Sequence, residues 1–138
     1  MDDATPQFLS PDTLPPPPGY SHVVSARPGR VVWTSGQVAM RADGTVAPPG
    51  DWEAQTRLCC ENVGRALEAA GAAWGDVVKL TFFVVDVTAL ETVRAVRDEF
   101  VDTNRPPASS LVQVAGLVRP DLLIELEAVA CPSAEDAR

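Results

Sequence analysis

The chain lacks most of the residue patterns by which enzymes and cofactor-binding proteins are usually recognised. Its 138 residues include one histidine, one tyrosine and three cysteines without C-x-x-C spacing, so we expect no metal site. No G-x-G-x-x-G or Walker sequence occurs, which excludes the common nucleotide-binding loops, and we expect no cofactor. No G-x-S-x-G elbow surrounds Ser35, which argues against a serine nucleophile.

Long apolar runs and basic clusters are also missing. No stretch approaches the roughly 20 apolar residues that a membrane-spanning helix needs, and the acidic start at residues 1–3 does not resemble a secretory signal. We therefore expect no membrane contact and a cytoplasmic location. Eleven basic and nineteen acidic side chains give a net charge of −8, which repels phosphate backbones, so we expect no nucleic-acid partner.

The rare reactive side chains leave alternatives open. Cys59 and Cys60 would diverge by about 100° on a helix and cannot easily bind one metal ion, so we interpret them as small buried or half-buried thiols in a reducing compartment. A single reactive thiol is the alternative, with Cys131 the least protected candidate. His22 is either an ordinary half-exposed residue or part of a pocket, and it has no partner at metal-ligand spacing.

The domain organisation follows from proline and from polar residues at the two ends. Residues 1–18 end in a run of four prolines, which favours an extended conformation, and we expect a flexible tail there. Residues 132–138 form a short polar tail. Residues 19–131 are expected to fold as a single domain.

Hydrophobic periodicity predicts the elements of this domain. The expected strands cover residues 20–26, 30–34, 38–40, 79–87, 110–114 and 122–130, with a turn at 27–30 joining the first two as an antiparallel pair. The expected helices cover residues 52–70 and 88–101. Asp51 and Gly71 mark the ends of the first, and Thr88 with Glu91 forms a capping box for the second.

This order predicts an α+β fold, a mixed sheet with two helices packed on one face. The other face would remain apolar and uncovered, which predicts an oligomer. In the last strand, Glu125 and Glu127 share one face while Ile124 and Leu126 point to the other. A partly buried Glu125 would suit proton transfer at neutral pH, whereas solvated glutamates on an exposed face are the alternative.

Several segments along residues 19–130 match one family pattern in combination. They are Gly19-Tyr20-Ser21, Thr34-Ser35-Gly36-Gln37, Glu53-Ala54-Gln55-Thr56-Arg57, Val78-Lys79-Leu80-Thr81 and Ile124-Glu125-Leu126-Glu127-Ala128. With them the chain resembles the Rid family (RidA/YjgF, endoribonuclease L-PSP-like), small bacterial and other proteins best known as enamine/imine deaminases. The resemblance implies a chorismate-mutase-like homotrimer, in which three sheets form a central barrel and small-molecule ligands bind in clefts between subunits.

The resemblance also implies roles for individual residues. Glu125 would position water or carry a proton, as the catalytic residue. The implied substrate-binding residues are Tyr20, Ser35, Gly36, Arg94, Ser109 and Val112. In the deaminating members, an arginine that binds the substrate carboxylate stands where Pro107-Ala108-Ser109-Ser110 has Ser109, and several have asparagine where this chain has Arg94.

The missing arginine predicts an enzyme that acts on an imine, an enamine or a related carbonyl compound but not on a standard 2-iminoacid, because a guanidinium–carboxylate pair is costly to lose. Arg94 either replaces that arginine as the anion-binding group or is a solvated helix residue. The alternatives for function are a non-catalytic small-molecule-binding or regulatory trimer, and an accessory enzyme of specialised metabolism. An endoribonuclease fits the charge of −8 badly.

Overall fold

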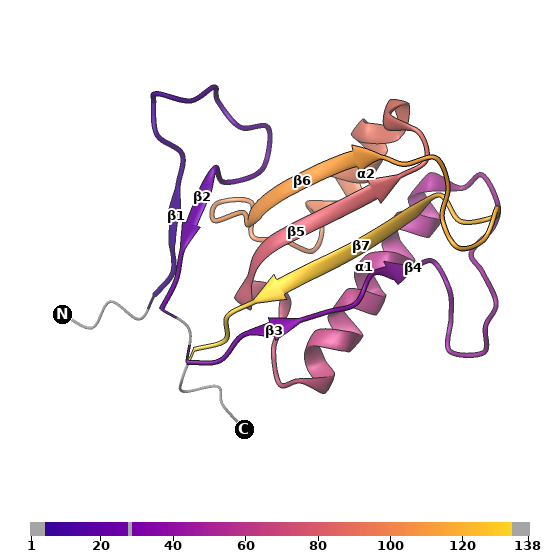
Figure 1. Ribbon diagram of the computed structural model, residues 1–138, viewed down its shortest axis with the longest axis horizontal. Helices are drawn as coiled ribbons and strands as arrows, with labels where there is room; N and C mark the ends of the chain where they lie inside the picture. Colours follow the sequence, from indigo (N-terminus) through magenta and orange to yellow (C-terminus); the bar gives the residue numbers. More distant parts are fainter. Residues whose placement is uncertain (1–4, 28, 134–138) are drawn as a thin grey trace.

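A mixed β-sheet forms the centre of the molecule in the computed structural model, which describes residues 5–27 and 29–133 (Figure 1). The strand order is β3-β7-β5-β6, and β4 also pairs with β7. β5 runs parallel to β6 and antiparallel to β7. The strands are β3 (Val32–Trp33), β4 (Gln37–Val38), β5 (Val77–Val84), β6 (Ala108–Gln113) and β7 (Ile124–Ala130).

Two helices, α1 (Trp52–Ala69) and α2 (Leu90–Arg97), lie on one face of this sheet (Figure 1). Alternation along β7 buries Ile124, Leu126 and Ala128 beneath them, each at most 2% exposed. This arrangement confirms the predicted α+β class with both helices on one face. None of the helices in the described ranges is long and apolar enough to cross a membrane.

Helix α1 begins and ends where local sequence signals predicted. The Asp51 side chain accepts a hydrogen bond from the Ala54 amide at 2.9 Å, which satisfies a donor of the first turn. Gly71 follows the C-cap with a φ of 71°, in the left-handed region that favours glycine. These two signals involve near neighbours in the chain, and at the C-terminal end Arg30 also donates hydrogen bonds to the carbonyl oxygens of Ala70 and Gly71.

The predicted start and end of the second helix were wrong. Asp86 Oδ1 accepts hydrogen bonds from both the amide and the hydroxyl of Thr88, at 2.9 and 2.7 Å, which lowers the pKa of Asp86. Thr88 therefore belongs to the short 3₁₀ helix η2 (Val87–Ala89) and does not cap α2, whose N-cap Ala89 makes no side-chain bond. Helix α2 ends at Arg97, four residues before the expected end.

The antiparallel pairing expected across residues 27–30 was also wrong. β2 (Val23–Ser25) pairs with β1 (Gln7–Leu9) in a separate two-stranded sheet, while β3 pairs with β7. A strand therefore forms inside the segment that the sequence assigned to a tail. The Arg105 guanidinium packs over the Phe8 ring, 4.8 Å from its centre, and this contact stabilises β1. Pro28 and residues 134–138 lie outside the described residues.

The sheet face opposite the helices is uncovered and partly apolar. Trp33 is 72% exposed and Val112 is 46% exposed on the single chain. Phe83 and Glu125 are half-buried on the same face. Exposed apolar side chains gathered on one face are typical of a contact with another molecule. The carboxylates of β7 lie on this same face.

Candidate functional site

Glu125 is placed by the pairing of β4 with β7. Val38 lies opposite Glu125 in the register, so the irregular segment at Ser35 and Gly36, just before β4, reaches the Glu125 side chain. A Cβ atom built on Gly36 would lie 2.7 Å from Glu125 Cδ and would clash with the carboxylate. Glycine thus allows the main chain to approach the carboxylate closely.

Glu125 belongs to a row of side chains across the uncovered face. The register places Phe83 opposite both Glu125 and Val112, so the three residues cross β7, β5 and β6 in one line. Glu125 and Phe83 are half-buried, whereas Ser35 and Val112 are exposed. The Glu125 carboxylate therefore lies in one row with the apolar side chains of Phe83 and Val112, and the exposed hydroxyl of Ser35 is beside this row.

Three other predicted residues, Tyr20, Arg94 and Ser109, line a separate cavity of about 280 Å³. This α2 cavity lies between α2 and the β6 edge of the sheet, with apolar walls that include Phe82 and Leu111. The Tyr20 ring packs against the only histidine, His22, in a T-shaped contact with centroids 5.3 Å apart. His22 Nε2 lies 2.7 Å from the Pro15 carbonyl oxygen, so His22 supports Tyr20 from outside the cavity.

Two guanidinium groups line the α2 cavity. Arg97 is 6% exposed, its Nε donates to Asp98 Oδ1 at 3.0 Å, and Gly19 lies directly against its guanidinium. Arg94 is half-buried, and its guanidinium has no hydrogen-bond or ion-pair partner in the described ranges. The cavity therefore offers cationic donors from helix α2, at a site where strand β6 supplies the hydroxyl of Ser109 and the apolar side chain of Leu111. Sequence reasoning missed Arg97, although it lies one helical turn after Arg94.

The predicted site residues form two groups within one chain. Ser109 faces the helices, as does its neighbour Leu80, while Val112 and Glu125 face the uncovered side. β6 and β7 are separated by β5, which sets them about 10 Å apart. Glu125 and the α2 cavity of the same chain are thus on opposite faces of the sheet.

The three cysteines are buried or half-buried free thiols. Cys59 and Cys60 are both fully buried, and burial raises the pKa of Cys60 to about 12 and that of Cys59 further. Burial also raises the pKa of the half-buried Cys131. These findings confirm the interpretation of buried or half-buried thiols. In the part of the chain that the structure describes, no group of three or more histidine, cysteine or acidic side chains could hold a metal ion.

The sequence and the fold agree with a known family. Residues 12–131 match the family model described as Endoribonuclease L-PSP. The chain belongs to this family, the Rid (RidA/YjgF) family. It is 40% identical over 104 residues to the 2-iminobutanoate/2-iminopropanoate deaminase of Escherichia coli, over 74% of this chain and 80% of that protein.

Solved structures of Rid proteins share the fold. The Rid protein YyfB from Yersinia pestis, whose function is described as unknown, superposes with a TM-score of 0.83 at 36% identity, over 92% of this chain and 98% of that one. E. coli TdcF, solved with bound serine, gives a TM-score of 0.68 at 34% identity, over 92% of this chain and 99% of that one. The Rid family assignment made from the sequence is confirmed.

Proposed function

We propose that this Rid protein hydrolyses the C=N bond of a small imine, or of the imine tautomer of an enamine, with Glu125 as the catalytic residue. The observation that carries the proposal is the half-buried Glu125 carboxylate seated against Gly36 on the uncovered sheet face. The relatives described as deaminases support the reaction class.

The reaction needs one proton carrier. Glu125 accepts a proton from water as the water oxygen attacks the imine carbon, and it returns this proton to the nitrogen, which gives a neutral carbinolamine. The Glu125 carboxylate then accepts the hydroxyl proton of the carbinolamine and passes it to the amine nitrogen as the C–N bond breaks, which leaves a carbonyl compound and ammonia. Phe83 and Val112 would flank the reacting carbon, with Ser35 and the Gly36 main chain beside it.

We further propose that the complete site forms between copies in a homotrimer. Glu125 cannot reach the α2 cavity of its own chain, because strand β5 and the plane of the sheet separate them. A neighbouring copy placed against the uncovered face could bring its own Tyr20, Arg94 and Ser109 to the Glu125 group. This arrangement would place all seven predicted residues around one small-molecule ligand.

The substrate preference follows from the α2 cavity. Ser109 cannot form the bidentate pair that the family arginine is expected to make, so we propose that standard 2-iminoacids are poor substrates. Arg94 is half-buried and unpaired in the described ranges, which favours its role in substrate binding over that of a solvated helix residue. Its position on α2 would hold an anionic group at a different point from the strand arginine of the relatives.

The direct test compares Glu125→Gln with Glu127→Gln, which lies two residues on along the same strand and is also half-buried. Ammonia release would be followed with imines generated in the cuvette, both 2-iminoacids and neutral imines. We expect Glu125→Gln to lose at least about 100-fold in kcat, the range of general acid–base catalysis, and to keep its oligomeric state. Glu127→Gln should stay within about twofold of the parent.

Two results would overturn this proposal. Unchanged turnover by Glu125→Gln would discard the mechanism. Saturable binding of a small molecule, with a higher unfolding temperature and no product from any imine, would favour the alternative of a binding or regulatory protein. RNA cleavage is not proposed, because a net charge of −8 repels a phosphate backbone.

A further inference from the structure

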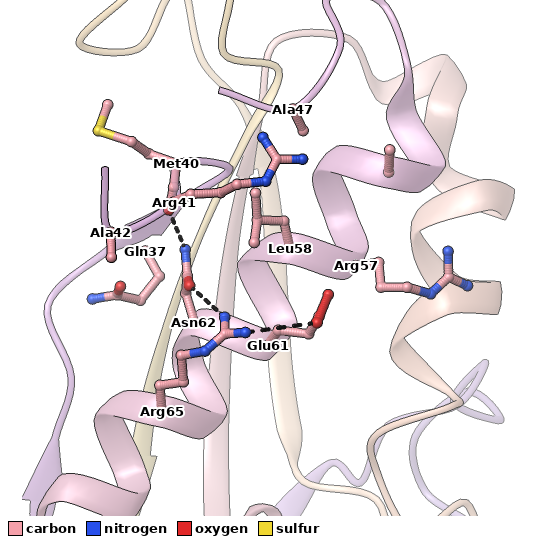
Figure 2. Close-up of a pocket in the computed structure, with 11 residues that line it drawn as sticks. Gln37, Met40, Arg41, Ala42, Ala47, Arg57, Leu58, Glu61, Asn62 and Arg65 are labelled. Carbon is pink, nitrogen blue, oxygen red and sulfur yellow. Dashed lines mark hydrogen bonds and ion pairs between the residues drawn. The ribbon is translucent and has the colours of Figure 1, made fainter. Parts of the chain in front are cut away.

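A second and larger cavity lies beside helix α1, at the β4 edge of the sheet, and the proposed reaction does not use it. Its volume is about 710 Å³, within the range of small-molecule sites, and it shares no lining residue with the α2 cavity. Figure 2 shows that its side chains come from the loop after β4 and from one face of α1. We call this cavity the α1 groove.

Asn62 builds one wall of the α1 groove. Its Nδ2 donates to the carbonyl oxygen of Val38 at 3.0 Å and to that of Met40 at 2.8 Å (the latter bond in Figure 2), which fixes the loop after β4 to α1. Its Oδ1 accepts from Arg65 Nη1 at 2.9 Å and so orients that guanidinium. Met40 also bridges to Val46, which closes the loop on itself. The wall is therefore held by several bonds before any ligand arrives.

The α1 groove carries positive charge on a strongly negative chain. Three arginines and one glutamate line it, which gives 3 − 1 = +2 for the lining side chains alone, where the whole chain has −8. Two glutamates outside the lining, Glu53 and Glu99, pair with one of these arginines. Arg57 is engaged by two glutamates, at 2.6 and 3.3 Å, and these raise its pKa. A cationic patch of this size suits a small anion and is too small to attract an extended polyanion.

The other two arginines retain free donors. Arg41 has only a long contact, 3.5 Å from Nη1 to Thr45 Oγ1, and Arg65 has its bond to Asn62 and a distant glutamate at 3.9 Å. A guanidinium has five N–H donors in a planar fork, so most donors of both groups are available to a ligand. In Figure 2 the two guanidinium groups lie on either side of the Asn62 side chain.

Apart from Gln37, the rest of the lining is apolar. Met40 and Leu58 supply the larger side chains, together with three alanines. We propose that the α1 groove binds a small organic oxyanion, with a carboxylate or phosphate held by Arg41 and Arg65 and an apolar body on Met40 and Leu58. Guanidinium forks match both oxyanions in geometry, and a flexible methionine adapts to the attached body. This site is independent of whether the chain hydrolyses imines.

Calorimetric titration of the full chain with phenyl phosphate and benzoate tests the proposal, with inorganic phosphate and benzyl alcohol as partial ligands. We expect saturable binding of at least one aromatic anion, weaker binding of inorganic phosphate and none of the neutral alcohol. The tighter of the two aromatic anions identifies the preferred oxyanion. The side-chain amide NMR signals of Asn62 and Gln37, which line the groove, should shift during the same titration.

Variants locate the binding. Arg41→Gln and Arg65→Gln should each weaken binding about tenfold or more, the effect of losing charge-assisted hydrogen bonds, while their thermal unfolding stays unchanged. Arg27→Gln removes the same charge from an exposed residue at another cavity and should bind as the parent does. The proposal is overturned if no anion binds at millimolar concentration, if both groove variants bind normally, or if only Arg94→Gln abolishes binding.

Discussion

The position of the Glu125 carboxylate depends on the absence of a side chain at residue 36. Alanine there would place its Cβ against Glu125 Cδ and Cγ, within 2.9 Å of both, so the whole glutamate side chain would have to move. We expect Gly36→Ala to lower kcat/KM for imine hydrolysis about 100-fold, since a displaced catalytic group loses its geometry. Stability should change by less than about 1 kcal/mol, because Gly36 is exposed.

Gly116→Ala is the matched control for this prediction. A Cβ at Gly116 would meet no atom within 4 Å, so the same substitution should leave both kcat/KM and stability near those of the parent. Steady-state kinetics together with urea unfolding of the two variants separate lost geometry from lost folding. Equal activity of Gly36→Ala and Gly116→Ala would show that the contact with Glu125 has no role in catalysis.

The sequence was a good guide to single residues wherever strand periodicity applied. Alternation along residues 124–128 predicted that Glu125 and Glu127 share the face opposite the core, and the structure confirms this orientation. The same rule separates Ser109 from Val112, three residues apart on β6 and therefore on opposite faces. The α1 groove was not predicted, although Arg57, Glu61 and Arg65 recur every four residues, because the loop that forms its other wall is brought there by Asn62.

At the scale of the elements, helix α1 carries two buried thiols, and their burial disfavours ionisation in the folded state. Burial raises the pKa of Cys60 from 9.0 to about 12, and it raises the pKa of Cys59 as well. Above pH 9 the unfolded chain therefore loses thiol protons that the folded chain keeps. Because the unfolded state then binds fewer protons, the free energy of unfolding must fall as pH rises.

We expect this decline to begin near pH 9, with a slope of up to about 1.4 kcal/mol per pH unit for each thiol. Urea unfolding between pH 7 and about pH 10 measures it, below the range in which lysine and tyrosine titrate fully. Cys60→Ala should be less stable at pH 7 because of the lost packing, yet it should show a shallower decline. A decline of the same slope in Cys60→Ala would assign the pH dependence to other groups.

Elements were predictable from the sequence to the extent that their determinants are local. The cap at Asp51 and the glycine at 71 act within one helical turn, and both ends of α1 were placed correctly. Thr88 matched a capping box, but its hydroxyl donates to the carboxylate of Asp86, two residues earlier, and does not cap α2. The pairing of β2 with β1 spans a proline-rich loop, and no local pattern specifies which strand finds which partner.

For the whole molecule, the uncovered sheet face and the net charge have opposite effects on assembly. Each copy carries −8, so a trimer would carry 3 × (−8) = −24, and long-range repulsion disfavours association at low salt. The exposed Trp33 and Val112 favour association, because their burial removes apolar surface from water. If the proposed trimer forms, a smaller fraction of it should therefore dissociate as salt is added. Whether it forms at all should depend on the burial of the apolar face.

Val112→Asp tests the role of this face in assembly. A carboxylate placed in an apolar contact costs several kcal/mol unless it is paired, so we expect the variant to be monomeric and to lose imine hydrolysis while the single chain stays folded. Ala95→Asp, on the exposed side of α2, adds the same charge away from the sheet face and should assemble as the parent does. Light scattering coupled to size exclusion gives the mass of each species, and circular dichroism confirms folding. A parent that is monomeric at micromolar concentration, or a Val112→Asp variant that assembles normally, would show that the uncovered face does not hold the copies together.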